Sequence, residues 1–277
     1  MTLEALPPLE HDPRQERVPV LSMQGITKSF GKVQALDDIH LDIFAGEVVA
    51  IVGDNGAGKS TLVKILAGVH PADEGTIEFD GHPVTIPDPT ASRALGIATV
   101  FQDLALCDNL DVVANLFLGR ELTGPALEEE EMERRAWELL RQLSARIPSV
   151  RVPIAALSGG QRQTVAIARS LIGDPRVVIL DEPTAALGVA QTAEVLNLIE
   201  RLRERGHGVV LISHNMADVQ AVADRIIVLR LGRNNGDFLA SDVGYEDIIA
   251  AITGATEHAR PLPEPPFPGP RPIGPAR

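Results

Sequence analysis

Cysteine is nearly absent from this sequence of 277 residues, which contains only Cys107. No internal disulfide bond can form, so we expect the protein to work in a reducing compartment. A lone cysteine more often packs as a small apolar side chain than serves as a reactive thiol, and we expect the former for Cys107.

Basic residues are also scarce, with 25 Lys and Arg against 38 Asp and Glu and a net charge of -13. Proteins that bind nucleic acid neutralise its phosphates with a basic face. The composition therefore argues against a nucleic-acid partner, although it leaves room for local basic patches. Repeats with the periods of propellers or solenoids are not found either.

Long apolar runs are missing as well. The longest, such as "VVAIV" at 48–52, have the length of a strand and not of a membrane span. The N-terminal residues lack the apolar stretch of a signal peptide. We therefore expect a chain that does not cross a bilayer by itself, and the length and the 44% of hydrophobic residues suit one domain with an insertion.

Both ends of the chain are rich in proline and charge, and we expect residues 1–19 and 256–277 to be disordered tails. The stretch "PLPEPPFPGPRPIGP" at 261–275 cannot form a helix or a central strand. A role as a polyproline ligand is conceivable, but an unstructured terminus is the simpler interpretation.

Between the tails, the pattern is first strand-rich, then helical, then alternating strand and helix. The segment 76–86 reads as a hairpin about an Asp-Gly pair. From Asp103 to about Ala156 the pattern turns helical, most clearly at 128–143, where Glu130–Arg134 and Glu131–Arg135 pairs predict a solvated helix face. The buried strands that follow suit a parallel sheet with active groups at its carboxyl edge.

The stretch "GDNGAGKST" at 53–61 matches the phosphate-loop pattern G-x-x-x-x-G-K-[ST] and lies between a predicted strand and a predicted helix. Its glycines let backbone N–H groups curl around a triphosphate, its lysine reaches the β and γ oxygens, and its serine is placed to ligate Mg²⁺. The predicted nucleotide-binding residues of this loop are Gly53, Asp54, Asn55, Gly56, Ala57, Gly58, Lys59, Ser60 and Thr61.

Polar side chains follow the later strands. In "VVILDEP", Asp181 is placed to hold the shell of a Mg²⁺ ion and Glu182 to orient an attacking water. His214 in "LISHN" could reach the γ-phosphate, and Gln102 in "VFQD" could contact both metal and water. Each residue alone would more often be an ordinary polar group at a strand end or a turn cap, so the prediction rests on their combination with the phosphate loop.

A second phosphate-facing helix start is predicted at "LSGGQRQ", residues 157–163. A serine cap, flexible glycines and free N–H groups at the positive end of a helix suit an anion. The residues concerned are Ser158, Gly159, Gly160 and Gln161.

Taken in order, these motifs resemble those of the ATP-binding subunits of ABC transporters. The resemblance covers about residues 20–255 and implies an α/β fold of the P-loop NTPase type: a RecA-like parallel sheet core, an N-terminal antiparallel β subdomain and a helical subdomain inserted at about 103–158. It also implies that Phe30 stacks on adenine, although the residue by itself is as typical of a core position.

The resemblance explains the second helix start. In this family two ATPase domains form a head-to-tail dimer, and the phosphate loop of one protomer and the signature helix of the other enclose one ATP. The implied cofactors are ATP and Mg²⁺. The implied partners are a second copy, transmembrane permease subunits and, indirectly, an extracytoplasmic substrate-binding protein, with the ATPase peripheral on the cytoplasmic face of the membrane.

Within the family, "DEPTAALGVAQTAEV" and "SHNMADVQAVADRI" look like the importers of fructose, pentoses and related monosaccharides, and the single ATPase copy resembles the fructose type. One departure is Gly188, which stands where most members have an aspartate and puts that contact across the dimer in doubt. The alternatives are soluble ABC-type ATPases of DNA repair, which carry long coiled coils, and of translation, which carry two copies. The sugar itself cannot be read from the chain.

Overall fold

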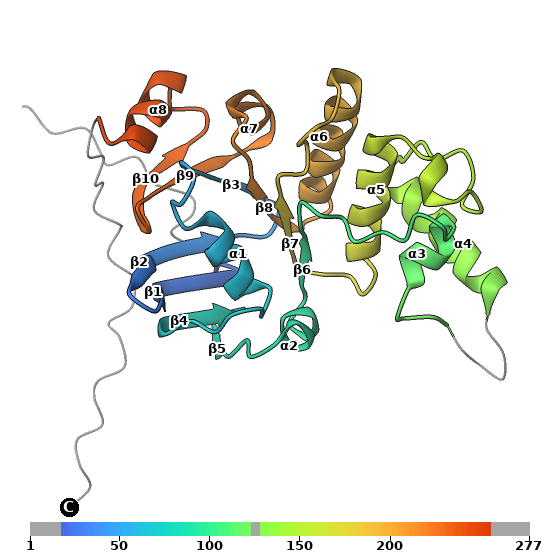
Figure 1. Ribbon diagram of the computed structural model, residues 1–277, viewed down its shortest axis with the longest axis horizontal. Helices are drawn as coiled ribbons and strands as arrows, with labels where there is room; N and C mark the ends of the chain where they lie inside the picture. The colour runs from blue at the N-terminus through green and yellow to red at the C-terminus, as the bar shows by residue number, and fades with distance from the viewer. Residues whose placement is uncertain (1–17, 123–127, 256–277) are drawn as a thin grey trace, which may run out of the picture.

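The computed structural model describes residues 18–122 and 128–255, which form two sheets together with helices on both faces of the larger sheet (Figure 1). The expected tails lie almost wholly outside these residues, so they remain predictions. No helix in the described residues is long and apolar enough to cross a membrane.

The first sheet is antiparallel, with the strand order β2-β1-β4-β5. Its strands are β1 (Leu21–Phe30), β2 (Val33–Ile43), β4 (Glu74–Phe79) and β5 (His82–Val84). The predicted hairpin is confirmed: β4 and β5 pair antiparallel around Asp80 and Gly81, both of which have the positive φ of a tight hairpin turn.

The second sheet has the order β10-β9-β3-β8-β7-β6 and is parallel except for the last strand at one edge, β10, which runs antiparallel to β9. Its strands are β3 (Val48–Val52), β6 (Ile97–Val100), β7 (Val177–Asp181), β8 (Gly208–Ile212), β9 (Arg225–Arg230) and β10 (Arg233–Leu239). All residues of β3 and β8 are buried, which is why these strands read as unbroken apolar runs.

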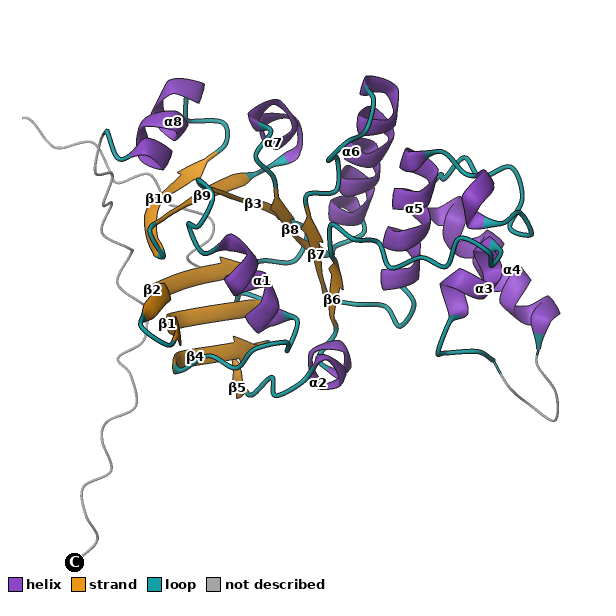
Figure 2. Cartoon of the chain, in the orientation of Figure 1, coloured by secondary structure: helices purple, strands orange, loops and turns teal. Residues whose placement is uncertain are grey.

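Alternate residues of the central strands enter different cores. Val49 and Ile51 pack with α1 and the antiparallel sheet on one face, whereas Val48 packs on the other face with the helices. Figure 2 shows these two layers on opposite sides of the parallel strands. The helices are α1 (Lys59–Leu66), α2 (Pro89–Ala94), α5 (Gly159–Ser170), α6 (Val189–Glu204), α7 (Met216–Val222) and α8 (Tyr245–Thr253).

The segment from Asp103 contains less helix than we predicted. It forms α3 (Val112–Phe117), α4 (Glu129–Gln142) and the short 3₁₀ turn Ile154–Ala156, with irregular backbone at both ends. One cause is the buried amide of Asn115, which bonds to the backbone of Cys107 and holds residues 107–111 in a loop. Cys107, for which we expected a buried position as a small apolar side chain, is only partly buried.

The charged face of α4 is exposed, as predicted, but one of the two pairings differs. Glu131 bonds to Arg135 as expected, at 2.7 Å, and also receives Arg134 at 2.8 Å in place of the predicted Glu130–Arg134 pair. The hydrogen bond from Arg134, followed by that from Arg135, lowers the pKa of Glu131 to about 2. An i,i+3 contact competes with an i,i+4 contact on any helix surface, and the sequence alone does not decide between them.

Candidate nucleotide-binding site

The phosphate loop, residues 53–58, joins β3 to α1 and is wedged between the two sheets. A Cβ atom on Gly53 would overlap the carbonyl oxygen of Leu229 in β9. A Cβ atom on Gly58 would lie 2.8 Å from the carbonyl oxygen of Ala35 in β2. Both glycines also have positive φ, so the pattern that predicted this loop reflects a close approach of backbone on two sides as well as a turn.

Lys59 is the first residue of α1, and its ammonium group points back over the loop. Its Nζ donates to the carbonyl oxygens of Gly53 at 2.7 Å and Asp54 at 3.0 Å. Burial lowers the pKa of Lys59, while the negative charges of Glu182, Asp54 and Asp181 oppose that effect. The same helix start carries the exposed Ser60 and the partly buried Thr61, so the hydroxyl groups and the cation belong to one turn.

The acidic pair lies where β7 ends. Burial, followed by the charge of Glu182, raises the pKa of Asp181, and the positive charge of Lys59 opposes this rise. Glu182 has a left-handed backbone with φ of 51°, and its N–H donates to the carbonyl oxygen of Ile212 at 2.9 Å. A positive φ is strained for a residue other than glycine, and residues with such backbone strain cluster at active sites.

His214 meets that glutamate from the neighbouring strand. Its Nδ1 lies 2.8 Å from Oε2 of Glu182, whose side chain is 15% exposed. Because β7 and β8 are adjacent and parallel, their carboxyl ends bring these two residues together from 32 positions apart in the sequence. A carboxylate held by an imidazole can accept a proton from a water. The sequence predicted separate roles for the two residues, Glu182 with the water and His214 with the γ-phosphate, and it did not predict this contact.

Two other predicted residues, Gln102 and Phe30, form no hydrogen bond or ion pair with the residues of this site within residues 18–122 and 128–255. Gln102 follows β6, which pairs with β7, and its side chain is exposed with no hydrogen-bond partner in the part of the chain described. Phe30, at the end of β1, is 44% exposed, so it is not a core residue. Its ring contacts His70, which the sequence did not single out.

The second helix start lies elsewhere. Ser158 caps α5 as predicted: its Oγ accepts the N–H of Gln161, and the Gln161 side chain accepts the N–H of Ser158. Gly160 has a packing role that we did not predict, since a Cβ atom would lie 3.0 Å from Cβ of Gln191 in α6. Because α5 packs at the β6 edge, three strand spacings or about 14 Å from β3, Ser158 is not beside its own phosphate loop.

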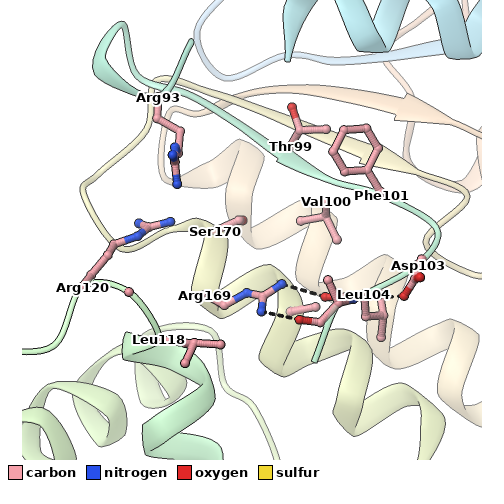
Figure 3. A pocket seen from close by; sticks show the side chains of 13 residues that line it. Arg93, Thr99, Val100, Phe101, Asp103, Leu104, Leu118, Arg120, Arg169 and Ser170 are labelled. Carbon is pink, nitrogen blue, oxygen red and sulfur yellow. Dashed lines mark hydrogen bonds between the residues drawn. The ribbon is translucent and has the colours of Figure 1, made fainter. Parts of the chain in front are cut away.

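A basic cavity of about 320 Å³ lies between β6, α5 and the end of α3, next to Gln102 in the chain (Figure 3). Arg93, Arg120 and Arg169 line it. Arg169 donates to the carbonyl oxygens of Leu104 at 2.6 Å and Ala105 at 2.8 Å. Partial burial, followed by the charge of Arg120, lowers the pKa of Arg169.

The positive charges of the three arginines in this cavity are not paired with carboxylates of the described residues. Arg93 and Arg120 donate to the backbone carbonyls of Pro89 and Ile172, and none of the three arginines forms an ion pair with a carboxylate of the described ranges. Asp103 also lines the cavity, but its Oδ1 accepts the N–H of Ala105. The arginines are scattered over the sequence, so no local signal predicted their meeting.

Residues 36–185 match the model of the ABC transporter family. The chain belongs to the ABC transporter family. The fructose import ATP-binding protein FrcA of Rhizobium meliloti is 43% identical over 87% of this chain and 96% of that protein. The xylose/arabinose import ATP-binding protein XylG of Sulfolobus acidocaldarius is 45% identical over 84% of this chain and 94% of that protein. The resemblance drawn from the motifs is thereby confirmed.

Further members of the ABC transporter family are also similar to this chain. The ribose import ATP-binding protein RbsA of Yersinia pestis is 39% identical over 86% of this chain but only 47% of its own length. Among solved structures, a nucleotide-free ATP-binding cassette from an ABC transporter has a TM-score of 0.74 and 28% identity, covering 85% of this chain and 96% of the other.

A dimeric bacterial ABC transporter cassette has a TM-score of 0.68 and 29% identity, covering 81% of this chain and all of that one. The predicted fold class is confirmed by these ABC cassettes. The alternative assignment to DNA repair or translation receives no support from relatives whose names refer to sugar import.

Proposed function

We propose that this chain is the ATP-binding and hydrolysing subunit of an importer for a monosaccharide. The observation that carries the proposal is the meeting of the phosphate loop, Asp181 and the Glu182–His214 pair at the carboxyl edge of one sheet. The names of the relatives supply the substrate class. Which monosaccharide is carried would be decided by other subunits.

The proposed chemistry assigns one task to each group. Backbone N–H groups of residues 53–58 and the ammonium of Lys59 hold the phosphates. The Glu182 carboxylate takes a proton from the attacking water, and His214 keeps that carboxylate oriented through the 2.8 Å contact. The partial burial of Glu182 strengthens these interactions because it excludes bulk water.

The donor set also suits Mg²⁺. Hard cations prefer oxygen ligands, and Mg²⁺ is commonly held by one or two carboxylates together with substrate phosphates and waters. Ser60, Asp181 and Gln102 offer a hydroxyl, a carboxylate and an amide oxygen, and the described residues include no cluster of three or more His, Cys, Asp or Glu that would hold a metal without the nucleotide. When bound, the ion would neutralise phosphate charge.

The proposed assembly is a head-to-tail homodimer. The exposed Ser158 and Gly159 at the start of α5 lie too far from the phosphate loop of their own chain to serve its nucleotide, but a two-fold partner would bring them to the other loop. A solved relative is dimeric. The remaining partners would be permease subunits, which would hold the chain at the cytoplasmic face of the membrane, and an extracytoplasmic binding protein on the other side.

The composite site can be tested with two lesions in a Glu182→Gln background, which allows trapped ATP to be counted. Lys59→Ala damages the phosphate loop, and Ser158→Arg obstructs the start of α5. We expect neither homodimer to trap ATP. A mixed dimer places both lesions in one site and leaves the other intact, so it should trap about one ATP per dimer.

Tagged mixed dimers, purified through both tags, would be compared with unmixed Glu182→Gln dimers, which should trap about two ATP molecules. If verified mixed dimers trap none, each Ser158 serves its own chain. That result would refute the head-to-tail arrangement.

The basic cavity in Figure 3 is the proposed docking place for the permease. Three arginines without a carboxylate partner in the described chain call for acidic groups on the bound element. We expect Arg93→Glu with Arg120→Glu to weaken copurification with coexpressed permease subunits by about tenfold or more. ATP binding by the isolated chain should not change, because neither residue lies at the phosphate loop.

A matched control is Arg141→Glu with Arg205→Glu, which reverses two exposed arginines outside the cavity and makes the same change in net charge. The docking proposal requires that this control keep the permease. Equal loss in both double variants would indicate a general effect of charge and would exclude the cavity as the docking place.

A further inference from the structure

An exposed aromatic ring stands at the end of β1, close to the phosphate loop. Phe30 is 44% exposed, and its cross-strand partner Val33 and the nearby Val69 are 67% and 46% exposed. Ala35 and Leu36, shortly after Val33, pack on Gly58 of the phosphate loop. The apolar surface around Phe30 therefore borders the loop, and a flat apolar ligand group could cover it.

His70 holds one side of this surface. The centroids of the Phe30 and His70 rings are 5.2 Å apart and the ring planes meet at 71°, which is the favoured edge-to-face arrangement of two aromatic rings. His70 is only partly buried, so this contact forms at the surface and not inside the core. A T-shaped neighbour restricts the ring of Phe30 to one orientation without covering both of its faces.

A set of hydrogen bonds with Asp73 fixes the backbone of β1 next to the Phe30 ring. Asp73 accepts the Lys28 ammonium at 2.6 Å and the N–H of Ser29 at 2.7 Å. Its own N–H donates to the carbonyl oxygen of Thr27 at 2.9 Å. Lys28 Nζ lies 5.5 Å from the centroid of the Phe30 ring, within the range of a cation–π contact.

Both holding residues lie in the connection that leaves α1. This helix begins at Lys59 and ends at Leu66, about 12 Å away, and the chain then passes through His70 and Asp73 before β4. The segment that grips Phe30 is thus the direct continuation of the helix that begins in the phosphate loop. The distance and direction between ring and loop are set by one short helix and by the hairpin packed on Gly58.

We propose that His70 is a positioning residue for the base of the nucleotide: its edge-to-face contact holds Phe30 in the orientation that stacks on the base. The inference rests on the proposed function, since it takes ATP as the ligand. Stacking on a single aromatic ring is tolerant of the kind of base, so the residue contributes affinity for any nucleotide that carries one. It makes no contribution to binding of the phosphates.

The test separates the base from the phosphates by comparing ATP with inorganic tripolyphosphate, both measured by calorimetry in a Glu182→Gln background. We expect His70→Ala to weaken ATP binding about two- to tenfold and to leave tripolyphosphate binding unchanged. His70→Phe keeps an aromatic edge and should restore most of the loss. Phe30→Ala should lose at least as much as His70→Ala, because it removes the stacking ring itself.

His82→Ala is the matched control, since it removes an exposed histidine of the same sheet, in β5, with no aromatic contact among the described residues. If the Glu182→Gln protein without further changes binds ATP no more tightly than tripolyphosphate, the proposed function as a nucleotide-binding subunit is refuted.

The positioning role of His70 is refuted if ATP still binds more tightly than tripolyphosphate by the same factor after His70→Ala. It is also refuted if His70→Ala weakens the binding of both ligands equally. In enzyme with Glu182 intact, the same variant should raise KM for ATP and leave kcat unchanged.

Discussion

Glu182→Gln is expected to leave ATP binding intact and to slow steady-state hydrolysis by a factor of about 10²–10⁴. The amide has the size of the carboxylate and can still bond to His214, so the geometry of the site should persist. It cannot take a proton from the attacking water. Phosphate release under saturating ATP measures the loss, and calorimetry measures binding.

A control for this change is Glu204→Gln, which removes one carboxylate from an exposed position at the end of α6. It should hydrolyse ATP at the rate of the unaltered protein. Turnover of Glu182→Gln within a few-fold of that rate would remove Glu182 from the proposed role, and a parallel loss of binding would show a damaged fold instead.

Arg225→Ala is expected to destabilise the fold by about 3–5 kcal/mol, the usual result of removing one partner from a buried ion pair. The Arg225 side chain is 3% exposed, and it contacts Glu47 at 2.8 Å, Asp237 at 3.0 Å and the carbonyl oxygen of Asp42 at 2.6 Å. These contacts join β9 to the residue that precedes β3, to β10 and to β2 of the antiparallel sheet. Urea unfolding followed by circular dichroism measures the change in midpoint.

The comparison variant is Arg176→Ala, which breaks an exposed pair with Asp80 at 3.1 Å. It should cost at most about 1 kcal/mol. If Arg225→Ala costs no more than this, the buried network does not stabilise the fold in the manner proposed. Adding Glu47→Gln to Arg225→Ala should recover part of the loss, because it removes the carboxylate left without a partner.

The pH dependence of the Arg225→Ala variant follows from Glu47. Burial raises the pKa of Glu47 above 4.5, and the charge of Arg225 opposes that rise. Without the arginine, the folded state would bind the Glu47 proton more tightly than the unfolded state. The additional loss of stability should therefore be small near pH 4.5 and grow as the pH rises through the pKa of the folded state.

The phosphate loop, the buried strands and the cap of α5 could be predicted because each is encoded by neighbouring residues. Gly53 and Gly58 are needed at fixed spacing for one turn, and Ser158 with Gln161 forms a capping box within four residues. Residues 177–180 of β7 and all of β8 are apolar because both faces are covered. The ends of these runs could therefore be read from the sequence, and with them the positions of Glu182 and His214.

What escaped prediction depends on pairs that are distant in the chain. Arg225 finds Glu47 across 178 positions, and Phe30 finds His70 across 40. Unlike His214, which follows an apolar strand, His70 has no local feature that marks it as functional. The irregular segment after Asp103 escaped for a different reason: its loop is held by the buried side chain of Asn115, an interaction that competes with the helix that the composition favours.

Helix α5 has a residue with a functional contact at each end, so this rigid helix connects the proposed dimer surface to the basic cavity. Ser158 caps its first turn, and Arg169 in its last turn grips the carbonyls of Leu104 and Ala105, next to Gln102. The helix has 12 residues and is about 18 Å long. On the proposed function, α5 would transmit motion as a rigid body. A displacement of residues 104–105, beside the basic cavity where the permease would dock, would move the Ser158 end of the helix, which would face the ATP of the partner.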